Sequence, residues 1–176
     1  MITRLLIEAR PGAGKTTAAR RLVKILQERG IPVQGFTTEE IREGGRRVGF
    51  AVTALGGPTA VLAHVNLAGP PRVGRYGVDL KAFEQVALPA LGDPRAGRVV
   101  VIDEVGKMEL ASAAFRGAVQ RLLDTGCPLV ATVHTHRHPF SDALKRQVQV
   151  VQLDAGNRDL LPVQLADRFF ADPATG

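Results

Sequence analysis

The sequence predicts a single α/β domain in which helices cover both faces of a mostly parallel sheet. Short apolar segments of strand length alternate with segments whose apolar residues recur at helical spacing, as in three-layer α/β folds. A chain of 176 residues with 45% hydrophobic content can also bury one good core. A Gly-Gly turn between two extended segments adds a small antiparallel hairpin insertion. We therefore expect residues 1–176 to form one domain.

The first apolar strand, residues 4–8, runs directly into a glycine-rich turn that precedes a helix. This stretch fits the phosphate-loop (P-loop) pattern G-x-x-x-x-G-K-[ST], with Ala9 in the first position. Glycines let successive N–H groups point at phosphate oxygens, Lys15 adds a charge at the β- and γ-phosphates, and the Thr16 hydroxyl can ligate Mg²⁺. The alternative is a purely structural turn. The predicted nucleotide-binding residues of the loop are Ala9, Arg10, Pro11, Gly12, Ala13, Gly14, Lys15, Thr16 and Thr17.

The elements after the loop follow from periodicity and from turn residues. The helix is expected over residues 15–29, followed by a strand over 33–37. Residues 39–47 contain the Gly-Gly turn of the hairpin, the extended pattern resumes over 48–55, and another antiparallel strand is expected over 60–65. Further strands are predicted over 98–104, 128–134 and 148–153, and further helices over 80–91, 112–126, 141–146 and 161–170, with Asp79 and Ser112 as the N-caps of the first two.

Two acids follow the most apolar strand. Asp103 lies at the carboxyl end of that strand, where ligands bind in parallel sheets. We predict that it holds Mg²⁺ through water, opposite Thr16. Glu104 comes next and points to where an attacking water would lie, so it is the candidate general base or water orienter. The alternative is that the two acids only begin a loop.

Negative charge on the transferred phosphoryl group in the transition state must be stabilised by cations in addition to Lys15. Arg42, Arg75, Lys107 and Arg137 all lie in predicted loops that open toward the nucleotide. Surface arginines are mostly solvated, so the sequence does not decide which of them completes the site. The predicted catalytic set is Lys15, Glu104 and Arg137.

Polar residues after the next two strands suggest further contacts. His134 and Thr132 are candidate sensors of the γ-phosphate, although a histidine there can equally be a satisfied strand-end residue. Alternation also places the imidazoles of His134, His136 and His138 on one side of an extended segment, which is a weaker metal hypothesis. Asn157 and Arg158 follow the last strand and are predicted to contact the base; Asn157 can instead be a turn residue.

Charge and cysteine content restrict the partners. The formal net charge of +6 makes nucleic acid a possible partner, but the cations are dispersed and aromatic residues make up only 5%. One cysteine excludes an internal disulfide, and we see neither a signal peptide nor an apolar run of membrane-span length. We expect a cytoplasmic protein, a monomer with no membrane partner.

The motifs together resemble the small nucleoside-triphosphatases of the thermophilic type, a P-loop family whose animal member is described as cancer-related. The resemblance rests on PGAGKTT at 11–17, GFTTEEIREGGRRVGF at 35–50, VGRYGVD at 73–79, VIDEVGKMEL at 101–110, TVHTHRHPF at 132–140 and NRD at 157–159. It implies a P-loop NTPase fold and Mg²⁺-dependent hydrolysis of ATP, GTP, CTP and UTP with little base selectivity. It also implies phosphate binding by residues 12–17 and metal and water roles for Asp103 and Glu104. Residues 8–10 depart from the family's usual small and glycine residues.

Two other functions remain as alternatives. A small nucleotide or nucleoside kinase would share the strand, loop and helix. It would also need an acceptor pocket and a closing Arg-rich lid, for which the hairpin over residues 39–50 could serve. Glu104 beside Asp103 favours activation of water instead. An RNA-associated switch protein, in which hydrolysis only resets a conformation, is suggested by the basic charge balance.

Overall fold

The computed structural model describes residues 3–93 and 97–170. The strands are β1 (Arg4–Glu8), β2 (Val33–Glu43), β3 (Arg46–Ala54), β4 (Thr59–His64), β5 (Arg72–Val73), β6 (Tyr76–Val78), β7 (Val99–Val105), β8 (Leu129–Val133) and β9 (Gln149–Gln152). The helices are α1 (Lys15–Glu28), α2 (Leu80–Leu91), α3 (Ala113–Thr125), α4 (Pro139–Gln147) and α5 (Leu161–Phe170), with a 3₁₀ turn at Glu109–Ala111.

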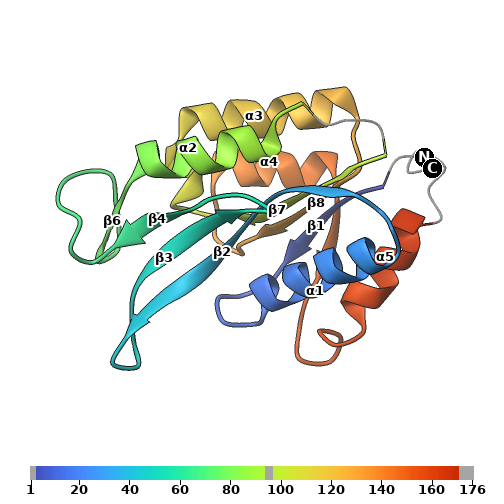
Figure 1. The fold of residues 1–176 in the computed structure, drawn as a ribbon, viewed down its shortest axis with the longest axis horizontal. Helices are drawn as coiled ribbons and strands as arrows, with labels where there is room; N and C mark the ends of the chain where they lie inside the picture. The colour runs from blue at the N-terminus through green and yellow to red at the C-terminus, as the bar shows by residue number, and fades with distance from the viewer. Residues whose placement is uncertain (1–2, 94–96, 171–176) are drawn as a thin grey trace.

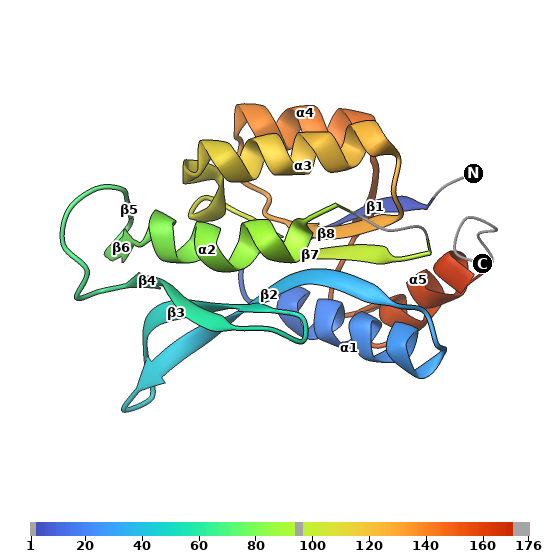
Figure 2. The same cartoon turned by 45° about the horizontal axis from the view of Figure 1, so that its top comes forward.

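Within the described residues the strands form one sheet in the order β5-β6-β4-β3-β2-β7-β8-β1-β9. The half from β2 to β9 is parallel, and the half from β2 to β5 is antiparallel. Helices α1 and α5 cover one face, and α2, α3 and α4 cover the other (Figures 1 and 2). This confirms the predicted three-layer α/β fold. Strand β8 lies between β1 and β7, so the phosphate loop and Asp103 project from strands that are separated by one neighbour.

The core divides into two layers because alternate residues of a buried strand point to opposite faces. On β1, Leu5 and Ile7 pack in the cluster that contains the inward residues of α1 and α5, whereas Leu6 packs in the other cluster. The same alternation separates Val101 from Ile102 on β7. A continuous apolar run is therefore what these strands require, and it is the pattern from which they were predicted.

Three phenylalanines hold β2 against α2 and α3. The ring centroids of Phe36, Phe83 and Phe115 are 5.3 to 5.9 Å apart, with edge-on geometry, and all three side chains are fully buried. We expect Phe83→Ala to lower the free energy of unfolding by about 3–5 kcal/mol, because it opens a cavity in this cluster. Denaturant titration measures the change, and Phe170→Ala, whose side chain is 66% exposed, is the control. A loss below about 1 kcal/mol would show that the cluster does not carry the expected packing energy.

The hairpin is longer than expected. Strand β2 continues to Glu43 and β3 begins at Arg46, so Gly44 and Gly45 alone form the turn. The charged residues that the sequence places in a loop instead pair across the two strands, with Arg42 opposite Arg47. The predicted loop near residue 75 also contains two short strands, β5 and β6. The antiparallel part of the sheet is thus larger than a single inserted hairpin.

Helix capping agrees with the prediction. The Asp79 side chain accepts a hydrogen bond from Ala82 N, and the Ser112 side chain accepts one from Phe115 N, each at the start of its helix. Glycine is required at position 35, where φ is +123° and an added Cβ would lie 1.9 Å from the Val101 carbonyl oxygen. That close approach lets β2 pack directly beside β7. Thr38 of β2 then lies next to Asp103, near the carboxyl end of β7.

Candidate functional site

The phosphate loop connects β1 to α1 through backbone that only glycine adopts easily. Gly12 and Gly14 have φ of 78° and 97°, in the left-handed region. Gly14 is the N-cap of α1 and provides no side-chain cap for the helix. The first N–H groups of α1 therefore face out of the loop, where the positive end of the helix dipole favours an anion.

Lys15 folds back over the loop. Its Nζ atom donates a hydrogen bond to the Ala9 carbonyl oxygen at 3.0 Å and lies 3.6 Å from Glu104 Oε2. The lysine side chain is only 10% exposed. Ala9 is itself attached to β8, since its N–H donates to the Val133 carbonyl oxygen at 3.4 Å. The structure thus brings together the predicted phosphate-binding lysine and the predicted catalytic acid.

Asp103 is buried at the carboxyl end of β7 and accepts hydrogen bonds from three neighbours. The Thr132 hydroxyl donates to Oδ1 at 2.7 Å, and the Thr38 backbone N–H donates to Oδ2 at 3.4 Å. The Thr16 hydroxyl is the third donor. Burial raises the pKa of Asp103, while these hydrogen bonds act in the opposite direction. Thr16 and Asp103 are therefore adjacent, as oxygen ligands of one cation would have to be.

Glu104 shares a confined space with a second carboxyl group. Burial raises the pKa of Glu104, and the charge of Asp103 adds to this, whereas Lys15 lowers it. Glu109 is buried in the 3₁₀ turn, and its pKa is raised well above the usual value by burial and then by Glu104. A Cβ atom added to Gly106 would lie 2.6 Å from Glu104 Oε1 and 2.9 Å from Glu109 Oε2. Gly106 therefore leaves the room that both carboxyl groups occupy.

Sequence reasoning did not select Glu109. The available signal was a third acid within six residues of Asp103, in the segment VIDEVGKMEL. An acid in a predicted loop is usually exposed, and only the 3₁₀ turn at Glu109–Ala111 buries this side chain against Glu104.

His134 directly follows β8, the strand between β1 and β7, and is 4% exposed. Neither of its ring nitrogens has a hydrogen-bond partner among the described residues. Burial lowers its pKa to about 4, and the neighbouring His136 and Lys145 act in the same direction. The imidazole is thus neutral near pH 7 and carries one unpaired N–H donor, which is costly unless a ligand accepts its hydrogen bond.

The triple-histidine metal hypothesis finds no support. The rings of His134 and His136 lie 5.5 Å apart between centroids, but the His138 Nδ1 atom instead accepts a hydrogen bond from Phe140 N as the cap of α4. Within residues 3–93 and 97–170, no three His, Cys, Asp or Glu side chains are grouped so as to hold a metal.

The lowered pKa of His134 predicts that the stability of the protein depends on pH. Its pKa is about 4 in the folded chain and about 6.5 when unfolded, so between these values the unfolded chain binds the extra proton. Its contribution to stability is complete above pH 6.5 and is lost as the pH falls toward 4. We expect native protein to lose more stability than His134→Asn between about pH 7 and pH 4.5, with His64→Asn as the control. Parallel urea-derived stability curves for native protein and His134→Asn would contradict this.

One cavity of about 670 Å³ connects these groups. It extends from the phosphate loop past the carboxyl ends of β7 and β8 to the β2–β3 hairpin and β6. Its lining includes Gly12, Gly14, Lys15, Thr16, Arg20, Thr38, Glu40, Arg47, Phe50, Tyr76, Glu104, Lys107, Glu109 and His134. A separate hollow of about 640 Å³ between α2 and α3 contains none of the predicted site residues.

The cations predicted to stabilise the transition state do not all reach the cavity. Lys107 lines it. The Arg137 side chain is 93% exposed and pairs with Asp142 at 3.0 Å, and it does not line the described cavity. The structure thus does not bring Arg137 into the cavity with the other predicted catalytic residues, because α4 begins beside it and supplies the acid with which it pairs. Arg20 and Arg47 line the cavity and were not selected from the sequence.

The predicted base contacts also lie outside the described cavity. The Asn157 amide is used within its own loop: its Oδ1 accepts from Asp154 N at 2.9 Å, and its Nδ2 donates to the Gln152 carbonyl oxygen at 2.7 Å. Asn157 is therefore a turn residue, which was the alternative prediction. Arg158 is exposed on the same loop.

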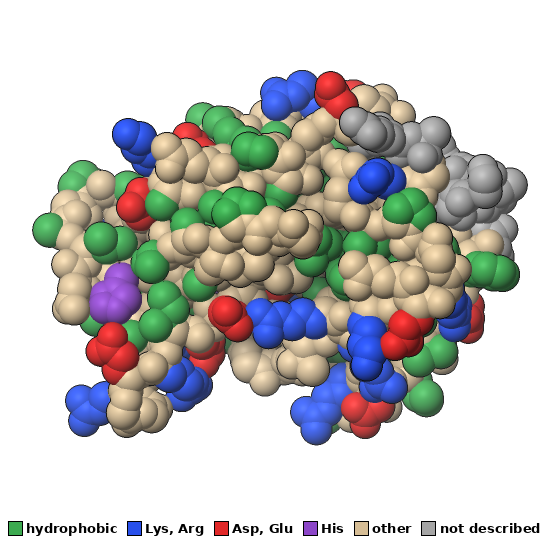
Figure 3. All heavy atoms as spheres, in the orientation of Figure 1, with side chains coloured by type: hydrophobic (Ala, Val, Ile, Leu, Met, Phe, Trp, Pro, Cys, Tyr) green, Lys and Arg blue, Asp and Glu red, His purple; other side chains and the backbone are tan. Residues whose placement is uncertain are grey.

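Surface charge is mixed on the face seen in Figure 3. Lys and Arg side chains lie beside acids there, without a continuous basic track. No helix in the described part of the chain has the length and apolar character that a membrane crossing requires.

Comparison with known proteins identifies relatives along most of the chain. A family model described as NTPase matches residues 4–166. The chain is similar to Nucleoside-triphosphatase THEP1 of Thermotoga petrophila, with 41% identity over 161 residues that cover 90% of this chain and 88% of the relative. Among solved structures, THEP1 from Aquifex aeolicus superposes with a TM-score of 0.83 at 30% identity, covering 96% of this chain and 99% of that one. The solution structure of a human cancer-related nucleoside triphosphatase gives a TM-score of 0.80 at 38% identity, with 94% and 96% covered.

Proposed function

We infer that this chain is a nucleoside-triphosphatase, because it belongs to the NTPase family and its relatives bear that name. The observation that carries the proposal is that an open phosphate loop and the partly exposed Glu104 line one cavity, directly beside the buried Asp103, which is hydrogen-bonded to the lining residues Thr16 and Thr38. The reaction is attack of water on the terminal phosphorus of a nucleoside triphosphate, which gives the diphosphate and phosphate.

The loop would hold the β- and γ-phosphates through the open N–H groups at the start of α1. Lys15 would then exchange its bond to the Ala9 carbonyl oxygen for a phosphate oxygen. His134, whose ring nitrogens have no partner among the described residues, would donate its N–H to the terminal phosphate. An acceptor there would remove the cost of a buried unpaired donor.

Thr16 and Asp103 offer the oxygen donors that Mg²⁺ prefers. Their hydrogen bond places the two side chains together, and Thr132 and the Thr38 N–H orient the carboxylate. Mg²⁺ commonly uses one or two protein oxygens, with water and substrate phosphates as its other ligands, so the lack of a three-residue cluster in the described chain is compatible with this site. When bound, Mg²⁺ would neutralise charge on the phosphate oxygens.

Glu104 would orient the attacking water and accept its proton. A general base works best when its pKa lies close to the working pH, and burial moves the pKa of Glu104 upward in that direction. Gly106 leaves the Glu104 carboxylate unobstructed.

The proposed substrates are ATP, GTP, CTP and UTP with little base selectivity. All the contacts assigned above, from the loop N–H groups, Lys15, Thr16 and His134, are made to phosphates or metal, which these substrates share. Selectivity for a base would require base-edge contacts, and the predicted ones at Asn157 and Arg158 do not line the cavity.

Phosphate release from each of the four triphosphates tests this proposal. With Mg²⁺ we expect all four to be hydrolysed at rates within about tenfold of one another, which corresponds to about 1.4 kcal/mol. Chelation of Mg²⁺ by EDTA should abolish release, and added Mg²⁺ should restore it. Hydrolysis of one triphosphate only would contradict the broad substrate range, and full activity in EDTA would contradict the metal assignment.

A further inference from the structure

The cavity continues well past the residues that the hydrolysis of a triphosphate requires. Strand β2 pairs with β7 up to Phe36, and beyond that point the β2–β3 hairpin projects from the carboxyl edge of the parallel sheet (Figures 1 and 2). Thr38 contacts Asp103 through its N–H. At about 3.4 Å per residue, Glu40 lies about 7 Å farther along β2 than Thr38. The hairpin therefore forms a wall beyond the metal-binding end of the site.

We call this part of the cavity the outer compartment. Its lining includes Arg20, Arg47, Phe50, Tyr76, Lys107 and Met108. A group bound there would lie on the same side as Glu104 and Glu109 and would face the terminal phosphate of a triphosphate in the loop. The hydrolytic mechanism uses none of the residues in this lining.

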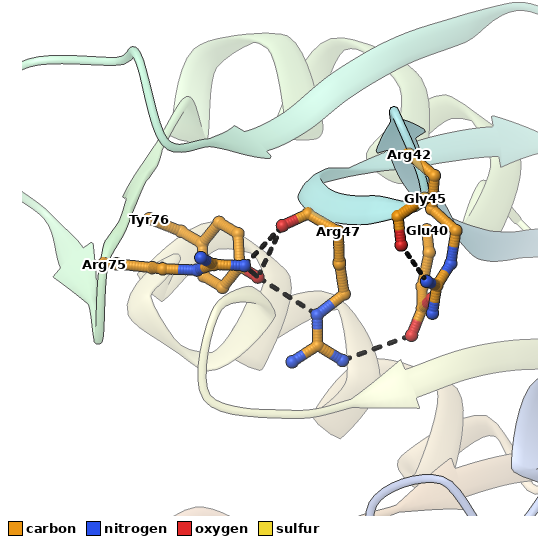
Figure 4. A network of polar contacts seen from close by, with 6 residues as sticks. All are labelled: Glu40, Arg42, Gly45, Arg47, Arg75 and Tyr76. Carbon is orange, nitrogen blue, oxygen red and sulfur yellow. Dashed lines mark hydrogen bonds and ion pairs between the residues drawn. The ribbon is translucent and has the colours of Figure 1, made fainter.

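Arg47 is held in one orientation in the outer compartment (Figure 4). Its Nε donates to the Tyr76 hydroxyl at 3.0 Å, and its Nη1 donates to Glu40 Oε1 at 3.1 Å. Its guanidinium carbon lies 5.3 Å from the centre of the Phe50 ring. Its Nη2 makes no hydrogen bond with any described residue, and 45% of the side chain is exposed, so this nitrogen is accessible to a ligand. A fixed guanidinium with a free N–H edge is suited to bind a phosphate.

The surroundings of Arg47 contain more positive than negative charge. Glu40 is the only acid in the network of Figure 4, and it pairs with both Arg42 and Arg47. Arg75 adds a third guanidinium, since its Nη2 donates to the Tyr76 hydroxyl at 3.2 Å. The nearby Arg20 and Glu39 pair with each other at 3.2 Å. An anion would therefore balance the charge of this cluster.

Lys107 provides a further cation in the outer compartment. It follows Gly106, is exposed, and makes no hydrogen bond or ion pair with any described residue. Phe50, Leu62, Val73 and Met108 contribute apolar surface to the same lining. Cations combined with apolar and aromatic surface are typical of sites that bind a phosphate together with a flat ring.

From this arrangement we propose that the outer compartment binds a nucleoside monophosphate, which accepts the terminal phosphoryl group. The inference rests on the proposed triphosphate site. Arg47 and Lys107 bind the phosphate of the acceptor, and the apolar lining receives its base.

The transfer step balances without any further reactant. An oxygen of the monophosphate forms a bond to the terminal phosphorus, and the bond from that phosphorus to the bridging oxygen breaks. The electron pair leaves with the diphosphate, so one triphosphate and one monophosphate give two diphosphates. A proton on the attacking oxygen, where present, passes to Glu104. Water attacks the same phosphorus when the compartment is empty.

Transfer of labelled phosphate tests the proposal. Native protein is incubated with Mg²⁺, ATP labelled at the γ-phosphate, and AMP, GMP, CMP or UMP. We expect label in at least one nucleoside diphosphate. Arg47→Ala should lower the rate of transfer by about 10- to 100-fold, as expected for a lost hydrogen bond to a charged group. Tyr76→Phe keeps the ring but removes the hydroxyl that holds Arg47, and it should raise the KM for the monophosphate severalfold.

Arg46→Ala is the matched control, because Arg46 precedes Arg47 on the same hairpin, is exposed and does not line the described cavity. It should transfer label at the native rate. Phosphate release without a monophosphate is measured in parallel. Release with no labelled diphosphate would overturn the acceptor site and leave the hydrolase intact, whereas absence of both would overturn the two proposals together. Native transfer by folded Arg47→Ala would contradict this location of the acceptor.

Discussion

Glu104→Gln should lower the rate of phosphate release by about 10²- to 10⁴-fold, the usual contribution of a positioned general base. Glutamine keeps the size and hydrogen-bonding capacity of the side chain, but it cannot accept a proton from water. Lys15 would lose its 3.6 Å ion pair with Glu104 and would be more available to phosphate. Triphosphate binding should therefore be retained or strengthened while turnover is lost.

Single-turnover phosphate release and calorimetric binding of a non-hydrolysable triphosphate separate these two effects. Glu43→Gln is the control, since Glu43 is an exposed acid at the end of β2. Near-native release by Glu104→Gln would show that another group activates the water. An equal loss of binding and turnover would indicate instead that Glu104 shapes the phosphate loop.

Lys15→Ala should have the second large effect, with a loss of about 10²- to 10³-fold in turnover, as for removal of one preorganised transition-state donor. The affinity for triphosphate should also fall, because the largely buried ammonium group folds back over the loop. Loss of Lys15 also removes the charge that lowers the pKa of Glu104, so the pH at which activity appears should move upward. Initial rates measured from about pH 5 to pH 9 give the turnover and the pH at which activity appears.

Lys24→Ala is the control for this variant. Lys24 lies on the same helix, its side chain is 76% exposed, and its one ion pair among the described residues is with Glu28. Its turnover and affinity should equal those of native protein. If Lys15→Ala retained native affinity and turnover, the loop would bind phosphate through its N–H groups alone, and the assigned role of Lys15 would be wrong.

The fold could be predicted because local signals and tertiary structure agree along most of the chain. The apolar run from Val99 to Ile102 is buried on both faces, as a central parallel strand requires. Ser112 and Asp79 cap helices because their side chains bond N–H groups within three residues. The phosphate loop was found in the same way, since Gly12 and Gly14 act through local backbone geometry.

The rest of the site depends on contacts between distant segments. Glu109 is buried by the 3₁₀ turn that packs near Glu104, and its side-chain environment has no local signature. Arg47 enters the cavity because Tyr76, 29 residues later in the chain, accepts its hydrogen bond. Arg137 and Asn157 were selected by their position after strands, but neighbours within five residues use their polar atoms.

Hydrolysis in ¹⁸O-labelled water tests the central claim most directly, namely that water attacks the terminal phosphorus of a triphosphate in this cavity. Native protein, ATP and Mg²⁺ are incubated in labelled water, and both products are examined by mass spectrometry. The account predicts one ¹⁸O atom in each inorganic phosphate released and none in ADP. Label in ADP would show attack at the β-phosphorus, and either that result or a complete lack of phosphate release would contradict the mechanism.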